Sequence, residues 1–248
     1  MSSPTRVLFV VSEAVPYTEP SDVASLARLL PEKLQESGDW EMRIMMPRYG
    51  IISERKNRLH EVIRLSNTDI VVGDSRESLK VKVASIPGLR LQVYFMENAK
   101  YFKRKGAYEG RAGESFDDNP ERALFFSRAA LATIHNLGWS PHVVHAMGWV
   151  SSFVPYLIRG QYRDDALLGG ARTLYTPGRF DVNTPLGGLA ASVDSAPEDT
   201  LRTVAERYAD ALVYPPGSAS EPRFTDVPDA LASDAASRYA ELVAAGGR

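Results

Sequence analysis

The hydrophobic residues of this chain fall into short strand-like runs that alternate with helical periodicities. The first run, residues 7–11, is apolar throughout and ends at Ser12, which is typical of a strand covered on both faces of a sheet. Two prolines interrupt the next loop, and Ser21 is then placed to cap a helix with apolar residues at helical spacing. Residues 6–34 are therefore predicted to form a strand, a loop and a helix. The loop would lie at the carboxyl end of the strand, where open α/β sheets bind ligands.

The following segments predict a change from helices to short strands. Gly38 is a predicted helix stop, and residues 41–46 form a second strand that completes one strand–helix–strand unit. Four β-prone runs then follow without a helix between them, at residues 60–65, 69–72, 79–86 and 89–96. This pattern predicts an antiparallel excursion, with residues 91–96 returning to the main sheet.

The second half of the chain returns to alternating helices and strands. Asn119 and Pro120 predict the start of a long helix, and Pro155 predicts a kink in a later apolar helix. Ser195 and Glu198 predict a capping box at the start of another helix. The predicted elements are a polar loop at 97–118, a helix at 119–137, a strand at 141–146, a helix at 149–158, a strand at 171–176, an irregular loop at 181–196, a helix ending near 208, a strand at 211–214, a loop at 215–228 and a helix at 229–245.

This order of elements predicts a Rossmann-like α/β fold. We expect a doubly wound, mainly parallel sheet with a β-hairpin excursion. The hydrophobic content of 44% is sufficient for a packed core, and residues 1–248 are predicted to form a single domain. Residues 181–248 would supply loops and the closing helices.

Composition argues against several classes of function. The 29 lysines and arginines nearly balance the 31 aspartates and glutamates, so the charge gives no reason to expect a nucleic acid or an anionic membrane as partner. The absence of cysteine excludes disulfides, thiolate nucleophiles and cysteine-ligated metals. The N-terminal apolar run is too short for a signal segment, and no run is long enough to span a membrane. We therefore predict a cytoplasmic protein.

No sequence motif for a cofactor or a metal is present. A phosphate-binding Walker loop, a dinucleotide-binding glycine pattern and a zinc signature are all missing, so no cofactor is predicted. His142 and His145 would point to opposite faces of one strand, and no metal site is predicted. His145, near the carboxyl end of its strand, is either a pocket residue or a hydrogen-bonded structural histidine.

Five sequence segments follow one another along the chain in a characteristic order. They are VLFVVSEAVPY, the strand ending MPRYG, VYFMEN followed by YFKRKGAY, DDNPERALFFSRAAL, and WSPHVVHAMGW followed by VPYLI. Together they resemble the N-terminal domain of bacterial glycogen and starch synthases over roughly residues 6–176. The resemblance implies one half of a two-domain enzyme that transfers glucose from ADP-glucose to a glucan end.

The resemblance also implies substrate contacts where this chain keeps the family's residue types. The candidates of this kind are Glu13, Tyr101, Arg104, Tyr108 and Asp118. His145 is added for its place near the end of a strand, and Trp149 for its aromatic ring. The aromatic side chains among them could stack on sugar rings or could be buried. Packing of the loops and the helix start is the alternative role for the others.

Three loops depart from the family pattern at positions where the chemistry is expected. Where the family has Lys-Thr-Gly-Gly-Leu, with the lysine on the donor phosphate, this chain has Glu19, Pro20, Ser21, Asp22 and Val23. Where the family has His-Asp-Trp-His, this chain has Met147, Gly148, Trp149 and Val150. An Ile-His-Asn segment is replaced by Pro177, Gly178 and Arg179. The carboxylates in the first loop would repel a pyrophosphate.

We therefore expect a glycogen-synthase-like protein of α-glucan metabolism that lacks stand-alone glucosyltransferase activity. Its expected partners are an α-glucan, a maltooligosaccharide or another protein chain, and ADP-glucose is kept only as a weak candidate. The family's second domain, which holds most of the nucleotide, is expected to be missing, so a partner chain or a second copy could cover the face it leaves. Two alternatives remain: an active transferase completed by a partner chain, and a structural or regulatory subunit unrelated to carbohydrate.

Overall fold

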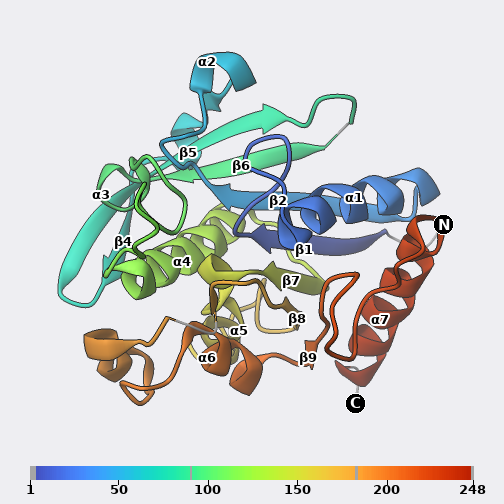
Figure 1. Ribbon diagram of the computed structural model, residues 1–248. Helices are drawn as coiled ribbons and strands as arrows, with labels where there is room; N and C mark the ends of the chain where they lie inside the picture. The colour runs from blue at the N-terminus through green and yellow to red at the C-terminus, as the bar shows by residue number, and fades with distance from the viewer. Residues whose placement is uncertain (1–3, 90, 182–183, 247–248) are drawn as a thin grey trace.

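A central sheet runs through the molecule, and helices cover both of its faces (Figure 1). The computed structural model describes residues 4–89, 91–181 and 184–246. The strands are β1 (Thr5–Val11), β2 (Trp40–Pro47), β3 (His60–Glu61), β4 (Thr68–Val72), β5 (Ser75–Ser85), β6 (Gln92–Glu97), β7 (Val143–Met147), β8 (Arg172–Thr176) and β9 (Ala211–Leu212). Their order is β3-β5-β6-β2-β1-β7-β8-β9, with β4 paired to β5. The six strands from β6 to β9 in this order are parallel, and β3, β4 and β5 form the predicted antiparallel excursion.

The helices are divided between the two faces of the sheet. They are α1 (Asp22–Ser37), α2 (Glu54–Asn57), α3 (Ala99–Phe102), α4 (Asn119–Leu137), α5 (Val154–Arg159), α6 (Leu201–Tyr208) and α7 (Leu231–Gly246). Helix α1 contacts α7, whereas α5 contacts both α4 and α6 (Figure 1). Right-handed connections from β1 outward in both directions place these two groups on opposite faces, so the fold is the predicted doubly wound sheet. No helix in the described part of the chain is long and apolar enough to cross a membrane.

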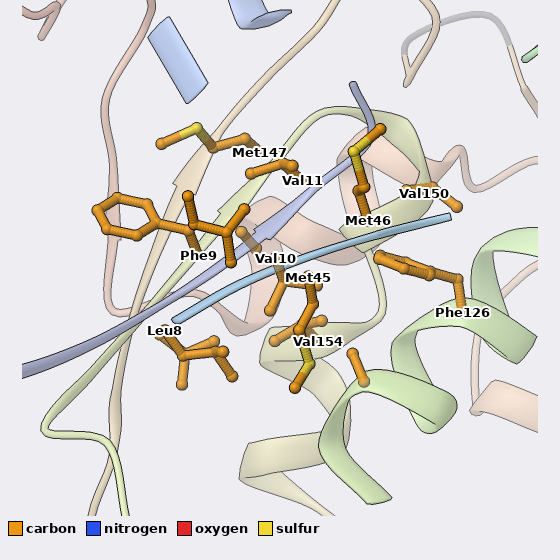
Figure 2. Packing of buried hydrophobic residues seen from close by; sticks show 14 of the residues in the cluster. Leu8, Phe9, Val10, Val11, Met45, Met46, Phe126, Met147, Val150 and Val154 are labelled. Atoms are coloured by element: carbon orange, nitrogen blue, oxygen red, sulfur yellow. The ribbon is translucent and has the colours of Figure 1, made fainter. Parts of the chain in front are cut away.

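Strand β1 lies at the centre of the core. Residues 7–11 are fully buried, as predicted for a strand covered on both faces. Figure 2 shows Leu8 directed to the same side as Val154 of α5, while Phe9 is directed to the opposite side. Alternating side chains of one strand thus contribute to the hydrophobic core on both faces.

Two helix predictions are wrong in their details. Pro155 does not kink a helix, because α5 begins at Val154 and the proline stands in its first turn, where a missing N–H costs nothing. Residues 149–151 form a separate 3₁₀ turn. The helix predicted from Ser195 starts instead at Leu201, because Thr200 and Thr203 form the capping box.

The start of α4 also differs from its prediction. Asp118, not Asn119, occupies the N-cap position, and its side chain makes no capping bond. The Asn119 side chain donates to the carbonyl of Tyr108 at 3.0 Å and accepts from Arg122 at 2.5 Å. Part of the loop predicted at 181–196 is a 3₁₀ helix, at Gly187–Val193, because apolar residues of this segment are buried.

Candidate functional site

The carboxyl ends of β1, β7 and β8 meet where the strand order reverses direction, between β1 and β7. Open α/β sheets bind ligands at this point. Two backbone hydrogen bonds tie the three loops together: Ser12 N–H donates to Met147 at 2.9 Å, and Gly148 N–H donates to Thr176 at 2.8 Å. The loops that depart from the family pattern therefore form one edge of the molecule.

A pocket of about 460 Å³ opens at this edge, and we call it the strand-end pocket. It is lined by Glu13, Pro20, Ser21, Asp22, Val23, Pro177, Gly178, Arg179, Arg202, Tyr214, Pro215, Ser218 and Ser220. Of the predicted substrate contacts only Glu13 lies in this lining, together with the substituted positions 20–22. Within the described residues no three histidine, aspartate or glutamate side chains are placed to hold a metal ion.

The first wall of the strand-end pocket is the N-terminus of α1. Ser21 caps the helix by accepting from the N–H of Ala24 at 2.9 Å. The Ser21 hydroxyl in turn donates to the carboxylate of Glu13 at 2.7 Å. Burial raises the pKa of Glu13, although the Ser21 hydrogen bond and the nearby Arg179 oppose that rise. Asp22 adds another carboxylate to the first turn of the helix.

The opposite wall is the loop after β8, which Asp181 holds in place. The buried Asp181 carboxylate accepts from the N–H of Gly178 at 2.9 Å and from the hydroxyl of Tyr175. Burial raises the pKa of Asp181, and its hydrogen bonds oppose the rise. Arg202 donates to the carbonyl of Gly178 at 3.2 Å, so the loop is anchored from both sides. Sequence reasoning missed Asp181 and Arg202, although Asp181 follows Gly178 at a spacing that suits a side chain closing a turn.

Gly148 is the point of closest contact between the loops. Its backbone has φ 77° and ψ −179°, a region that only glycine occupies readily. A Cβ at this position would lie 2.1 Å from the hydroxyl oxygen of Ser12. Val150, two residues on, is fully buried and packs in the core shown in Figure 2. Neither substituted position therefore offers a side chain to the pocket.

The three aromatic candidates are all buried. The exposed fractions of Tyr101, Tyr108 and Trp149 are 2%, 6% and 3%, so no ring face is free to stack on a sugar. Tyr108 instead stacks on Phe180 with ring centroids 4.0 Å apart, and its hydroxyl lies 2.5 Å from that of Thr184. These rings pack within the loop, which agrees with burial, the second of the two roles considered for the aromatic side chains.

Arg104 and Asp118 form an ion pair with each other. Two parallel hydrogen bonds of 2.6 and 2.5 Å join the guanidinium to the carboxylate. The pair closes the polar loop onto the start of α4, and neither residue lies in the lining of the strand-end pocket. Asp118 instead lines a separate pocket of about 720 Å³, together with Tyr101, so the predicted contact of this pair with substrate stays a prediction.

His145 lies inside the protein and is not part of the strand-end pocket. Its Nδ1 is 2.7 Å from the Tyr239 hydroxyl, and its Nε2 is 2.8 Å from the Thr176 hydroxyl. Tyr239 belongs to α7, so the histidine links β7 to the helix that covers this face. This geometry matches the structural alternative for His145.

Because of His145, the free energy of unfolding is expected to decrease as the pH is lowered below 7. Burial lowers the pKa of His145 from 6.5 to about 3. Between these values the unfolded chain binds a proton that the folded chain does not, so the contribution is complete above pH 6.5 and is lost as pH falls. We expect a loss of roughly 2 kcal/mol from this group between pH 7 and pH 5.

Urea denaturation of wild type and His145→Gln at both pH values measures this contribution. The stability difference between the two proteins should shrink toward pH 5, because the variant cannot take up this proton. The raised pKa values of Glu13 and Asp181 act in the opposite direction but are common to both proteins. His60→Gln, at an exposed position, should retain the wild-type acid sensitivity. An unchanged difference between wild type and His145→Gln would contradict the assignment.

Comparison with known proteins identifies the family. The profile of the starch synthase catalytic domain matches residues 6–177. The chain belongs to this family. It is 38% identical to a glycogen synthase of Chlorobium luteolum over 172 residues, which are 69% of this chain and 35% of that protein. It is also 39% identical to a glycogen synthase of Chlorobaculum parvum over 158 residues, which are 63% of this chain and 32% of that protein.

This starch synthase family domain also has the fold of a solved relative. The catalytic domain of Starch Synthase IV from Arabidopsis thaliana, bound to ADP and acarbose, superposes with a TM-score of 0.67 and 20% identity. The superposition covers 85% of this chain and 45% of that one. The chain spans about a third of the length of the glycogen synthases it matches. The predicted resemblance to the N-terminal part of glycogen and starch synthases is confirmed.

Proposed function

We propose that this starch synthase family domain acts in α-glucan metabolism without transferring glucose from a nucleotide sugar by itself, and that it binds an α-glucan or a partner chain. The observation that carries the proposal is the closed N-terminus of α1. A phosphate binds at a helix N-terminus through free N–H groups and positive charge. Here Ser21 caps the helix, and the Glu13 carboxylate accepts from the Ser21 hydroxyl.

The charges around this helix end also disfavour a phosphate. Asp22 stands in the first turn, and Glu19 precedes the cap. Each carboxylate close to a phosphate would cost about 1 kcal/mol in water and more in a dehydrated site. Of the two arginines on the opposite wall, Arg202 is engaged with Gly178, and the side chain of Arg179 is 71% exposed at the rim.

A neutral sugar suits the strand-end pocket better than a pyrophosphate. Carboxylate, hydroxyl and guanidinium groups can all hydrogen-bond to sugar hydroxyls. Glu13, Ser218 and Arg202 supply such groups, and Tyr214 adds an aromatic ring to the lining. These features support binding of a glucan end, with no requirement for a charged donor.

Thermal-shift measurements with ADP-glucose, ADP and maltoheptaose test the donor part of the proposal. A ligand at 100 times its dissociation constant adds about 2.7 kcal/mol, which corresponds to a rise of about 5–10 °C for a chain of this size. We expect a change of less than about 1 °C with millimolar ADP-glucose. A large shift by a nucleotide bound in the strand-end pocket, or incorporation of glucose from ADP-glucose into glycogen, would overturn the proposal and favour a transferase.

Affinity electrophoresis in a glycogen gel tests the glucan part. We expect retardation of the wild type, and its loss in Tyr214→Ala, which removes the ring from the strand-end pocket. Tyr208→Ala is the matched control, since Tyr208 lies outside this lining and packs against Tyr156. If glycogen does not retard the wild type, the glucan part of the proposal fails and a partner chain is the ligand that remains. If both variants are retarded equally, the glucan binds outside the strand-end pocket.

A further inference from the structure

A second, basic groove lies on the opposite side of the loop that follows β1. It has a volume of about 670 Å³ and lies between the segment of α2 and β3 and the turn that joins β5 to β6, in the upper part of Figure 1. We call it the basic groove, and its lining is Tyr17, Lys56, Asn57, Arg58, His60, Val83, Ala84, Ser85, Ile86, Pro87, Gly88, Leu89 and Gln92. Its residues are not shared with the strand-end pocket.

Cationic and proton-donating side chains gather in the basic groove without carboxylates. Lys56, Arg58 and His60 lie within five residues of one another, and no aspartate or glutamate belongs to the described lining. Among the described residues, none of these three side chains has an ion-pair partner within 4.0 Å. Neighbouring like charges repel, so this arrangement favours an anion between them.

The two carboxylates nearest in sequence are directed elsewhere. Glu54, on the same short helix, contacts Lys82 at 2.7 Å and Arg48 at 3.0 Å. Glu61 follows His60 on β3, where successive side chains alternate between the two faces, and its cross-strand partner is Lys82. Neither carboxylate therefore neutralises the groove.

The walls of the basic groove are fixed by local hydrogen bonds. Ser53 caps α2 by accepting from the N–H of Lys56 at 3.3 Å, and Arg58 ends the helix with φ 52°. On the other side Leu89 N–H closes a turn onto Ile86 at 3.0 Å, with Gly88 at φ 82°. Arg28 donates to the carbonyl of Pro87 at 3.2 Å and braces the turn from α1.

We propose that the basic groove binds a small phosphorylated metabolite. The ammonium of Lys56 and the guanidinium of Arg58 would contact the phosphoryl oxygens, since charge-assisted hydrogen bonds to phosphate are strong. Apolar side chains of Ala84, Ile86 and Leu89 line the turn side of the groove and suit a less polar part of the ligand. The basic groove thus offers cationic side chains without the carboxylates of Glu13 and Asp22 that line the strand-end pocket.

Isothermal titration calorimetry at constant ionic strength tests the proposal with inorganic phosphate, pyrophosphate and glucose 1-phosphate. We expect saturable binding of at least one probe, weakened about tenfold or more in Lys56→Gln/Arg58→Gln. The control Lys103→Gln/Lys105→Gln removes the same charge at other exposed positions and should bind like the wild type. Absence of saturable binding to the wild type, or equal weakening by both double variants, would overturn the proposal.

The same variants separate this groove from the proposed function. A thermal shift by ADP or ADP-glucose that disappears in Lys56→Gln/Arg58→Gln arises in the basic groove and leaves the strand-end pocket without a donor. A shift that persists in that variant contradicts the proposed function instead. The substituted lysines and Arg58 are all exposed, so wild-type melting temperatures are expected for the unliganded variants.

Discussion

Replacing Arg122 by alanine is expected to lower the free energy of unfolding by about 3–5 kcal/mol. Arg122 is fully buried, and burial lowers its pKa to about 10, so it remains charged at neutral pH. Its guanidinium donates to the carbonyls of Tyr101 at 2.8 Å and Ala107 at 2.7 Å, and to the side-chain oxygen of Asn119 at 2.5 Å. Without the arginine these three oxygens lose their donor in the interior, which is the main cost.

The aromatic rings around Arg122 add to this effect. The guanidinium carbon lies 5.1 Å from the ring centroids of both Phe116 and Trp149 and 5.6 Å from that of Phe102. Arg122→Lys keeps the charge but cannot reach all three oxygens at once, because its ammonium is compact and lacks the planar fork. We expect it to be destabilised as well, though less than the alanine variant.

Chemical denaturation with linear extrapolation measures both variants. Arg111→Ala, at an exposed loop position, is the control and should stay within about 0.5 kcal/mol of the wild type. A loss below about 1 kcal/mol for Arg122→Ala would mean that water replaces the guanidinium among the three oxygens and the aromatic rings. The candidate aromatic residues would then have to be regarded as accessible rather than as packing.

The elements predicted correctly from the sequence are those whose starts and ends depend on residues close to each other in the chain. Ser21 and Gly38 bound α1 as predicted, because a cap and a left-handed stop depend only on residues within one turn. The capping box at Ser195 was predicted wrongly because Thr200 offers equivalent chemistry five residues later. Full burial of Leu201 in the first turn favours the later start, and burial is a tertiary property that local spacing does not contain.

The candidate site was predictable only in part, for the same reason. Glu13 could be placed because it directly follows a central strand, and the carboxyl end of such a strand is a known location for ligands. Arg202 lines the pocket and the buried Asp181 holds one of its walls, and both depend on the path of the chain after β8, which matches no motif. Residue type alone also left open whether Trp149 would be exposed or buried. Trp149 is buried because its ring packs against the buried guanidinium of Arg122.

Replacing Gly148 by alanine is expected to cost about 3 kcal/mol or more. Two causes act together, the glycine-specific backbone conformation and the approach of a new Cβ to within 2.1 Å of the Ser12 hydroxyl oxygen. Gly170→Ala is the matched control, because nothing lies within 4 Å of its Cβ position. Chemical denaturation should find the control near wild type and Gly148→Ala strongly destabilised.

A double variant separates the two causes. Ser12→Ala removes the closest atom but leaves the Ser12 Cβ position, 3.1 Å from the new Cβ, so Ser12→Ala/Gly148→Ala should regain part of the loss and retain the backbone strain. Gly148→Asp, which introduces the residue implied by the family pattern, should be at least as damaging as alanine because its side chain is larger. Wild-type stability of Gly148→Asp would mean that the loops after β1 and β7 can separate. If the loops cannot separate, introducing single residues of the family pattern will not recreate the family's site at the strand ends. The reason is that the backbones of three loops are packed around Gly148.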